Sequence, residues 1–366
     1  MHIAEKMKRE WNRRATHHAP FWVATEHFHN DRQFEQSGKN TAKALLSRVA
    51  PYSSPSWTVL DIGCGIGRVL KPLASHFQQL VGIDVSGEMI AQSKKWLDGC
   101  INVETLETSG VDLHAFRDQS FDLVYSFVAF QHMPRPVFAR YLEESHRVLT
   151  THGYLAFQIP IGVSRDPVLE DTVSMRQYST DELAKELQRC GFKLIDENEI
   201  NTSTQTRAKP NNAKLNRHHS HCAKTYVAHV EDTWNGSRRS MRLNNEFYLA
   251  KKSGEVIREK NTNWLETECD QNFSLLDTRM YIWFAEQCLD ADQNEEALRT
   301  YKSLQEQEPD SLEKWTRTVE LLIEQKKFEE ARITLEKLTA ALPTYEALNK
   351  LLETQKRDVQ DTIIQI

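Results

Sequence analysis

The sequence is poor in cysteine pairs, in metal-ligand motifs and in long apolar runs. The six cysteines are scattered along 366 residues, at positions 64, 100, 190, 222, 269 and 288, with no C-x-x-C pair. This spacing argues against a disulfide framework and favours a reducing cytoplasm. The longest apolar stretch, Tyr154 to Val163, is interrupted by Gln158 and Pro160 and is too short to cross a bilayer. The charged N-terminus has no apolar core segment, so we expect neither a membrane span nor a secretory signal.

A chain of this length exceeds one typical core, and the usual domain size predicts two or three domains. Hydrophobic residues make up 39% of the chain, which excludes global disorder. The net charge of -6 is an average over unequal parts. Residues 201–243 contain eight basic and two acidic residues, so this basic insert carries +6 and the rest of the chain -12. Its Asn, Ser, Thr and His content predicts a long inserted loop.

Strand-like and helix-like segments alternate ahead of the basic insert. Buried strands are predicted at 57–62, 79–84, 102–107, 121–127 and 153–160, with helices at 67–76, 87–98 and 134–149. A capping sequence at 179–182 predicts a further helix that ends at Cys190-Gly191, followed by strands at 192–200 and 245–251. This alternation is typical of a doubly wound α/β sheet.

A glycine-rich turn follows the first predicted strand, in the run VLDIGCGIG from Val59 to Gly67. Glycines there permit a tight turn and let a ligand approach the backbone. The second strand ends at Asp84, 19 residues after Gly65, where a carboxylate can accept both ribose hydroxyls of an adenosine. The G-x-G-x-G spacing differs from the dinucleotide-binding G-x-G-x-x-G, and no Walker lysine follows. We therefore predict a nucleoside-cofactor site, with a dinucleotide-binding unit or a structural turn as the alternatives.

Four segments in order, LDIGCGIGR, VGIDVSGEMI, SFDLVYSFVAFQHMP and YLEESHRVLTTHGYLAFQI, resemble the motifs of class I S-adenosylmethionine-dependent methyltransferases. The resemblance covers about residues 10–200 and implies a seven-stranded Rossmann-like sheet whose last strand is antiparallel. It implies S-adenosylmethionine as the cofactor, with Asp61 at the methionine moiety, Asp84 at the ribose and Met89 at the adenine face. The other cofactor-binding residues that it implies are Gly63, Cys64, Gly65, Gly67, Val85, Ser109, Gly110, Val111, Ser126 and Phe127.

The adenine edge departs from this pattern. Many relatives in the resembled family carry an acid there, whereas Ser109-Gly110-Val111 holds none and Asp112 is the nearest. The resemblance therefore leaves two candidates for the adenine amino group, Asp112 or a hydroxyl.

His132, just past the fourth predicted strand, is the candidate general base. It follows a strand end, where doubly wound sheets open into a ligand crevice. A base is needed only if the methyl acceptor is a hydroxyl or a protonated amine. The alternative is a histidine that caps the helix starting near Pro134 or forms hydrogen bonds in the core.

The N-terminal cap, residues 1–50, combines cationic and aromatic side chains. We predict a lid over the acceptor, and an amphipathic helix buried on the sheet is an equal and compatible alternative. The residues expected at the acceptor or in the lid are Trp11, Arg14, Phe21 and Trp22, together with Gln131 beside His132.

The run from Arg217 to Cys222, RHHSHC, offers contiguous histidines but no second spaced pair of ligands, so no metal site is predicted. We expect this loop to frame an acceptor entrance, for an anionic substrate, or to be a solvated loop. Nucleic acid is not an expected partner, because no aromatic residues interleave the basic ones to stack on bases.

The last hundred residues are nearly free of glycine and contain a 34-residue repeat. At this spacing, Tyr281 pairs with Trp315, Ala297 with Ala331, Leu304 with Leu338, and Pro309 with Pro343. This register resembles tetratricopeptide repeats, and a third partial unit from Thr344 to about Asp358 would cap the stack. We place the domain boundary near Glu255, between a methyltransferase domain (1–255) and an all-α helical-repeat domain (256–366). Bracing or self-association is favoured over peptide capture for these repeats.

Together these features predict a cytoplasmic S-adenosylmethionine-dependent methyltransferase. The expected acceptor is a small molecule or sugar (glycan), methylated on oxygen, and the basic insert suits an anionic one. Protein or RNA methylation is the alternative within the enzyme class, and a non-catalytic assembly adaptor is the alternative outside it. The intact Asp61, glycine loop and Asp84 argue against the adaptor.

Overall fold

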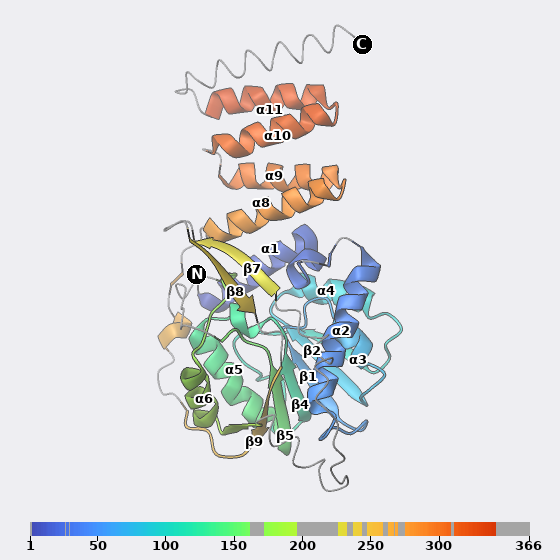
Figure 1. Cartoon of the computed structure of the whole chain (residues 1–366), viewed down its shortest axis with the longest axis vertical. Helices are drawn as coiled ribbons and strands as arrows, with labels where there is room; N and C mark the ends of the chain where they lie inside the picture. Colours follow the sequence, from blue (N-terminus) through green and yellow to red (C-terminus); the bar gives the residue numbers. More distant parts are fainter. Residues whose placement is uncertain are drawn as a thin grey trace, which may run out of the picture. The chain divides into compact units, whose positions relative to one another are not determined.

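The chain forms two compact units, Met1–Gln271 and Asn272–Ile366. The computed structural model describes residues 2–25, 27–28, 30–161, 172–195, 226–232, 237–243, 247–258, 263–266, 268–269, 275–308 and 311–341. The first unit is α/β, and the residues described in the second are helical (Figure 1). The division falls later than the expected boundary at Glu255, because η3 (Asn263–Glu266) contacts α1 (Ile3–Val23) and Glu268 forms a β-bridge with His2.

Seven strands of the first unit form one sheet, in the order β3-β2-β1-β4-β5-β9-β6. They are β1 (Thr58–Ile62), β2 (Gln79–Asp84), β3 (Val103–Glu107), β4 (Phe121–Ser126), β5 (Leu149–Phe157), β6 (Phe192–Leu194) and β9 (Tyr248–Lys252). The strand β9, last in the chain, lies antiparallel between β5 and β6, while β1 to β5 are parallel. The predicted seven-stranded sheet with an antiparallel last strand is confirmed. Because the order reverses between β1 and β4, a ligand crevice opens at their carboxyl ends.

Helices cover both faces of this sheet (Figure 1). They are α2 (Asp31–Val49), α3 (Leu70–Leu73), α4 (Gly87–Trp96), α5 (Arg135–Val148) and α6 (Thr180–Arg189). Successive side chains of a strand point to opposite faces. Leu60 and Leu155 therefore join the core shared with α5 and α6, while Val59 and Ala156 join the core shared with α2, α3 and α4. This alternation gives the sheet two buried faces and explains its near-continuous apolar strands.

Some element bounds differ from those predicted. The helix expected at 67–76 is regular only over Leu70–Leu73, because Gly67 has φ +83° and the chain before Leu70 forms turns. The strand expected at 153–160 begins at Leu149, where α5 runs directly into β5. Of the strands expected at 192–200 and 245–251, residues 196–200 and 245–246 lie outside the described residues.

The basic insert is not simply a loop. Its second half forms an antiparallel two-stranded sheet of β7 (Tyr226–Asp232) and β8 (Ser237–Leu243), so the expected loop over 201–243 was wrong there. Residues 201–225, with the run from Arg217 to Cys222, lie outside the described residues.

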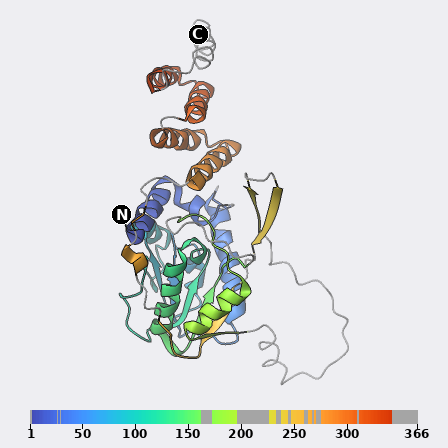
Figure 2. The same cartoon turned by 90° about the vertical axis from the view of Figure 1, so that its left-hand side faces the viewer.

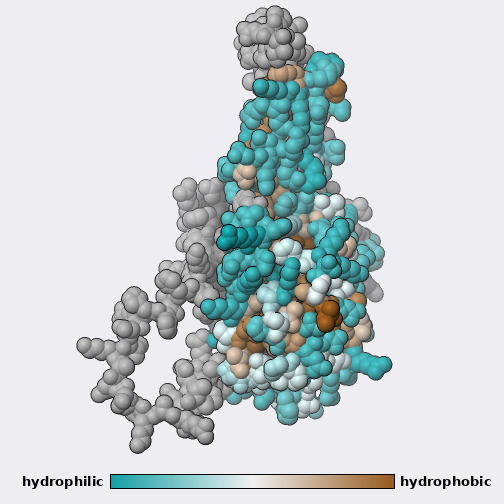
Figure 3. Space-filling model, turned by 90° about the vertical axis from the view of Figure 1, so that its right-hand side faces the viewer, coloured by the Kyte–Doolittle hydropathy of each residue, from teal (hydrophilic) through white to brown (hydrophobic). Residues whose placement is uncertain are grey.

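The described part of the second unit forms two antiparallel helix pairs stacked in sequence order (Figure 2). The helices are α8 (Leu275–Asp290), α9 (Asn294–Gln307), α10 (Leu312–Glu324) and α11 (Phe328–Ala341). The 34-residue register is confirmed as a packing repeat, since Tyr281 and Trp315 are both buried and Ala297 and Ala331 are both 0% exposed. On the face in view, the outward side chains of this unit are mainly hydrophilic (Figure 3). Pro309, Pro343 and the third partial unit lie outside the described residues.

The cysteines of the described ranges, at positions 64, 100, 190, 269 and 288, are all free thiols. Cys222 lies outside those ranges. A helix of the length and apolarity needed to cross a membrane does not occur in the part of the chain that the structure describes.

Gly38 lets α2 approach the backbone just after the glycine-rich turn. A Cβ at this position would overlap the carbonyl oxygen of Arg68. Gly38→Ala would normally favour a helix, but here we expect it to lower the free energy of unfolding by about 1–3 kcal/mol through overpacking. Denaturant unfolding of the first unit checks this, with the exposed Ser47→Ala on the same helix as the control. Equal stability of the two variants would contradict the close approach.

Candidate active site

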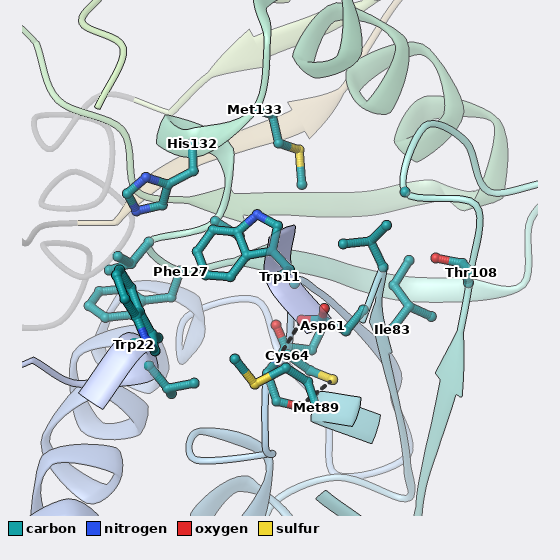
Figure 4. Close-up of a pocket in the computed structure, with 18 of the residues that line it drawn as sticks. Trp11, Trp22, Asp61, Cys64, Ile83, Met89, Thr108, Phe127, His132 and Met133 are labelled. Carbon is teal, nitrogen blue, oxygen red and sulfur yellow. Dashed lines mark hydrogen bonds between the residues drawn. The ribbon is translucent and has the colours of Figure 1, made fainter. Parts of the chain in front are cut away.

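A cavity opens at the carboxyl ends of β1, β2 and β4, where the strand order reverses (Figure 4). The side chains that line it come from the turns after these strands, from the N-terminal helix α1 and the start of α4, and from the turn after β3 and from α5. It therefore lies where the sequence predicted the cofactor, and its walls can be described strand by strand.

The glycine-rich turn holds the floor of the cavity. The amides of Gly63 and Cys64 donate to the carbonyl of Ile83, at 2.8 and 3.0 Å, and the Gly65 amide donates to Asp84 Oδ2 at 2.9 Å. Gly63 and Gly65 have φ of +76° and +54°, the left-handed region that favours glycine. A Cβ on Gly63 would overlap Ala129, and one on Gly65 would overlap Val23. The turn thus ties β1 to β2 and leaves room for the side chains of Ala129 and Val23.

Two carboxylates face this cavity from neighbouring strand ends. Asp61 is 3% exposed and accepts a 2.7 Å hydrogen bond from the Tyr125 hydroxyl. Burial raises the pKa of Asp61 to about 7, against the lowering by that hydrogen bond, and the charge of Asp84 adds to the rise. Burial also raises the pKa of Asp84 to about 6, although the amides of Ser86 and Gly65 donate to it. Two carboxylates whose ionised forms burial disfavours, on one cavity, favour a ligand with a positive charge and hydroxyl donors.

The wall beyond Asp84 is apolar. Val85 and Met89 line it with Gly110, and Met89 is 1% exposed. Ser109 and Val111 do not line the cavity, and the Ser109 hydroxyl instead accepts from the Val111 amide at 3.3 Å.

Two polar side chains at this end of the cavity were not predicted from the sequence. Thr108, at the end of β3, and Tyr141, on α5, both line the cavity. The acidic candidate Asp112 does not line it, and its carboxylate instead accepts from the backbone and side chain of His114. The hydroxyl alternative for the adenine edge is therefore the one that the geometry favours. Thr108 follows a predicted strand end, a position that could have indicated it.

The turn after β4 forms the opposite wall. Phe127 lines the cavity, whereas Ser126 is fully buried and donates to the Ile62 carbonyl at 2.9 Å, which links β4 to β1. Val128 also lines the cavity and has φ +61°, a strained conformation for a β-branched residue. Gly67 does not line the cavity and packs toward Leu97.

His132 follows in the short helix η1 (Phe130–His132) and lines the same cavity. Its Nδ1 lies 2.7 Å from the Val173 carbonyl oxygen, and its Nε2 lies 3.1 Å from Gln131 Nε2. A carbonyl oxygen can only accept, so Nδ1 carries the proton and Nε2 accepts from the Gln131 amide. Gln131 itself is buried and does not line the cavity. The neutral ring therefore keeps its basic nitrogen at Nε2.

The N-terminal helix α1 covers one side of the cavity. Trp11 and Trp22 line it, and the Trp11 ring meets the His132 ring edge-on, with centroids 5.7 Å apart (Figure 4). The other two residues expected here point elsewhere. Phe21 is 0% exposed and packs on Trp22, and Arg14 is 0% exposed, with its guanidinium 4.7 Å from the Trp11 ring. The helix α1 is thus at once a cover of the cavity and a buried packing helix.

Asn12 attaches α1 to the start of α4, a contact that the sequence did not indicate. Its Oδ1 accepts from the Ser86 hydroxyl at 2.7 Å and from the Glu88 amide at 3.1 Å. Ser86 also caps α4 through the Met89 amide. The cover is therefore hydrogen-bonded to the same turn that carries Asp84.

Comparison with known proteins agrees with this geometry. Residues 59–153 match the family model of a methyltransferase domain, and residues 289–353 match that of a tetratricopeptide repeat. The chain is 31% identical over 126 residues to 2-methyl-6-phytyl-1,4-hydroquinone methyltransferase of Synechocystis, which covers 31% of this chain and 38% of that protein. It is 33% identical over 134 residues to trans-aconitate 2-methyltransferase of Yersinia pestis, which covers 35% and 47%. The chain thus spans less than half the length of these curated relatives.

Among solved structures, a SAM-dependent methyltransferase from Aquifex aeolicus is 24% identical, with a TM-score of 0.34. The match covers 42% of this chain and 81% of that one.

The raised pKa of Asp61 makes stability depend on pH in a defined direction. The folded chain holds this proton up to about pH 7, against an ordinary value of 3.8, so its contribution to stability falls as pH rises through that window. The Asn side chain of Asp61→Asn does not ionise, so this variant avoids that loss of stability. We expect it to be more stable than the parent at pH 8, and we expect the difference in stability to become smaller toward pH 5. Thermal unfolding without added ligand measures this, with the exposed Asp98→Asn as the control. A gain that does not grow with pH would contradict the assignment.

Proposed function

We propose that this chain, which carries a methyltransferase domain followed by tetratricopeptide repeats, transfers a methyl group from S-adenosylmethionine to a small-molecule acceptor. The observation that carries the proposal is the pair of carboxylates, Asp61 and Asp84, on one cavity at the switch point of the sheet. The cofactor offers what such a pair needs, namely an ammonium group, a sulfonium charge and a ribose diol. The donor set of the cavity therefore fits it.

The proposed roles follow the walls of the cavity. Asp61 and the turn at Gly63 to Gly65 would hold the methionine moiety, and Asp84 would accept from the ribose hydroxyls. Met89 would lie on the adenine face, with Thr108 in place of the missing acid at its edge. When bound, the cofactor supplies an electrophilic methyl group, so the protein has mainly to orient donor and acceptor.

The acceptor would lie between the turn after β4 and α1, where Trp11, Trp22 and Phe127 surround His132. If the acceptor is a hydroxyl, Nε2 of His132 would take its proton, in place of the hydrogen bond from the Gln131 amide, as the oxygen receives the methyl group that the cofactor would supply. The hydrogen bond from Nδ1–H to the Val173 carbonyl would stabilise the imidazolium that forms.

Three observations favour a small acceptor, for which we propose methylation on oxygen. Trp11 and Trp22 of α1 line the cavity together with Phe127, which makes it an aromatic-lined space. The relatives named above are named for small molecules, a hydroquinone and trans-aconitate. The basic insert, at +6, suits an anionic acceptor such as a carboxylic acid or an acidic sugar. We place this reaction in the cytoplasm, in keeping with the free thiols.

We assign the helical repeats to association with a protein, most simply a second copy of this chain. Each pair buries its seam residues against the next pair, and the surface in view is hydrophilic (Figure 3). Such stacks use their exposed faces for binding. Light scattering of the full chain and of a chain truncated after Gln271 tests this, because self-association requires the truncated chain to be the smaller oligomer.

Asp84→Ala should remove most cofactor binding. The variant loses the two ribose hydrogen bonds to a charged acceptor, so we expect the Kd for S-adenosylmethionine to rise by about 100-fold or more. Titration calorimetry of the full chain measures this, with the exposed Asp98→Ala as the matched control. If the parent chain shows no binding at millimolar cofactor, the enzyme assignment fails.

His132→Ala should slow methyl transfer without loosening the cofactor. For a hydroxyl acceptor, loss of the base should lower turnover by roughly 100-fold. The assay follows tritiated methyl groups from the cofactor into a fractionated lysate, which also shows whether the label enters a small molecule, a glycan, a protein or RNA. The exposed His114→Ala is the control. Unchanged turnover across pH would remove His132 as the base.

A further inference from the structure

A stripe of charged side chains on α1 is buried rather than solvated. Lys6, Glu10 and Arg14 follow one another at four-residue spacing and are 4%, 2% and 0% exposed. Lys6 Nζ lies 3.0 Å from Glu10 Oε1, and Arg14 lies 3.6 Å from Glu10 Oε2. Burying ions costs several kcal/mol each unless their hydrogen bonds are completed, so such a stripe is a poor way to gain stability alone. The partner that Glu10 and Arg14 share in another segment shows what else this stripe does.

That partner is the hydroxyl of Thr172, which lies 162 positions from Glu10 in the sequence. It donates to the Glu10 carboxylate and accepts from Arg14 Nη1 at 3.0 Å. Thr172 is 1% exposed, so the hydroxyl bridges an anion and a cation where water cannot replace it. The bridge fixes the beginning of the segment Thr172–Tyr178 against α1.

The same segment holds His132. The Val173 carbonyl, one residue after the bridge, accepts the hydrogen bond from His132 Nδ1 at 2.7 Å. Arg176, 0% exposed, donates from Nη1 to the His132 carbonyl and from its amide to the Gln131 carbonyl, at 2.9 and 2.8 Å. The backbone and the ring of His132 are therefore both held by one short segment.

A second contact runs from α1 to the same ring. Arg14 stacks on Trp11 at 4.7 Å and lies 5.5 Å from Trp22, and Trp11 in turn packs edge-on against the His132 ring (Figure 4). Arg14 thus reaches His132 by two routes, one through Thr172 and Val173 and one through Trp11. The residues of the first route, Arg14, Thr172 and Val173, are all buried.

We infer that Thr172 and Arg14 are positioning residues, through which closure of α1 over the cavity sets the tautomer and orientation of His132. This inference rests on the proposed role of His132 as the base. An imidazole that lost the Val173 carbonyl would be free to carry its proton on Nε2 and could then not accept one from a hydroxyl. The cover and the base would in this way become competent together, and an uncovered cavity would lack an aligned base.

The test compares hydroxyl-deleting variants of the full chain. Thr172→Val removes the bridge with little change of volume, and Thr172→Ser restores the hydroxyl. Thr105→Val is the matched control, because Thr105 is also buried and its hydroxyl bonds to Ser93 at 2.8 Å, in a different part of the unit. If Thr172→Val fails to fold, Arg14→Lys, which keeps the buried charge, takes its place.

The readout is the tautomer of His132 in a histidine-15N-labelled chain, assigned by its absence from the spectrum of His132→Gln. We expect the Nδ1–H pattern in the parent, in Thr172→Ser and in Thr105→Val, and its loss in Thr172→Val. In the tritiated-methyl assay, Thr172→Val should lower turnover by about tenfold or more while the Kd for the cofactor is unchanged. A parent with the Nε2–H pattern, or a Thr172→Val spectrum like the parent's, would overturn the inference.

The tautomer spectrum needs neither cofactor nor acceptor, which separates the two proposals. Absence of cofactor binding together with the expected tautomer change would refute the proposed function and leave the coupling of α1 to His132 intact. Methyl transfer with an unchanged tautomer in Thr172→Val would do the reverse.

Discussion

At the carboxyl end of β1, two glycines leave space that side chains of two neighbouring segments fill, and the rest of the site depends on this close packing. The turn at Gly63 packs against Ala129 after β4, and the turn at Gly65 packs against Val23 at the end of α1. Because the Gly65 amide also donates to Asp84, the same turn aligns the end of β2. A side chain at either glycine would separate the cover, the cofactor wall and the base-bearing turn.

The buried charges of the first unit form two groups, which differ in what neutralises them. Asp61 and Asp84 lie on the cavity with raised pKa values, since burial is not offset by a nearby cation of matching strength. Two ionised carboxylates cost free energy in an empty buried cavity, and a bound cation lowers that cost. On α1, by contrast, the carboxylate of Glu10 is neutralised by side chains of the protein itself, in ion pairs with Lys6 and Arg14. One set of charges is therefore suited to a ligand and the other to holding the fold.

The strained Val128 belongs to the same arrangement. A β-branched residue in the left-handed region persists only where its surroundings hold it, and here the neighbouring Ala129 is pressed against Gly63. The turn that follows places His132 on the cavity, beside Trp11. Strain at the end of β4 is thus located where the acceptor is proposed to bind.

The sequence by itself determined the sheet, the glycine turn, Asp61 and Asp84, and the 34-residue helical repeat. These features depend on local periodicity and on glycine positions, which a single segment of chain carries. The tertiary structure alone decided that Arg14 and Phe21 turn away from the cavity, that Ser126 links β4 to β1, and that Thr108 and Tyr141 line it. It also brought Thr172 to Glu10 across 162 positions. No local pattern encodes such contacts, because the side chain that a buried charge or hydroxyl meets is chosen by how distant segments pack.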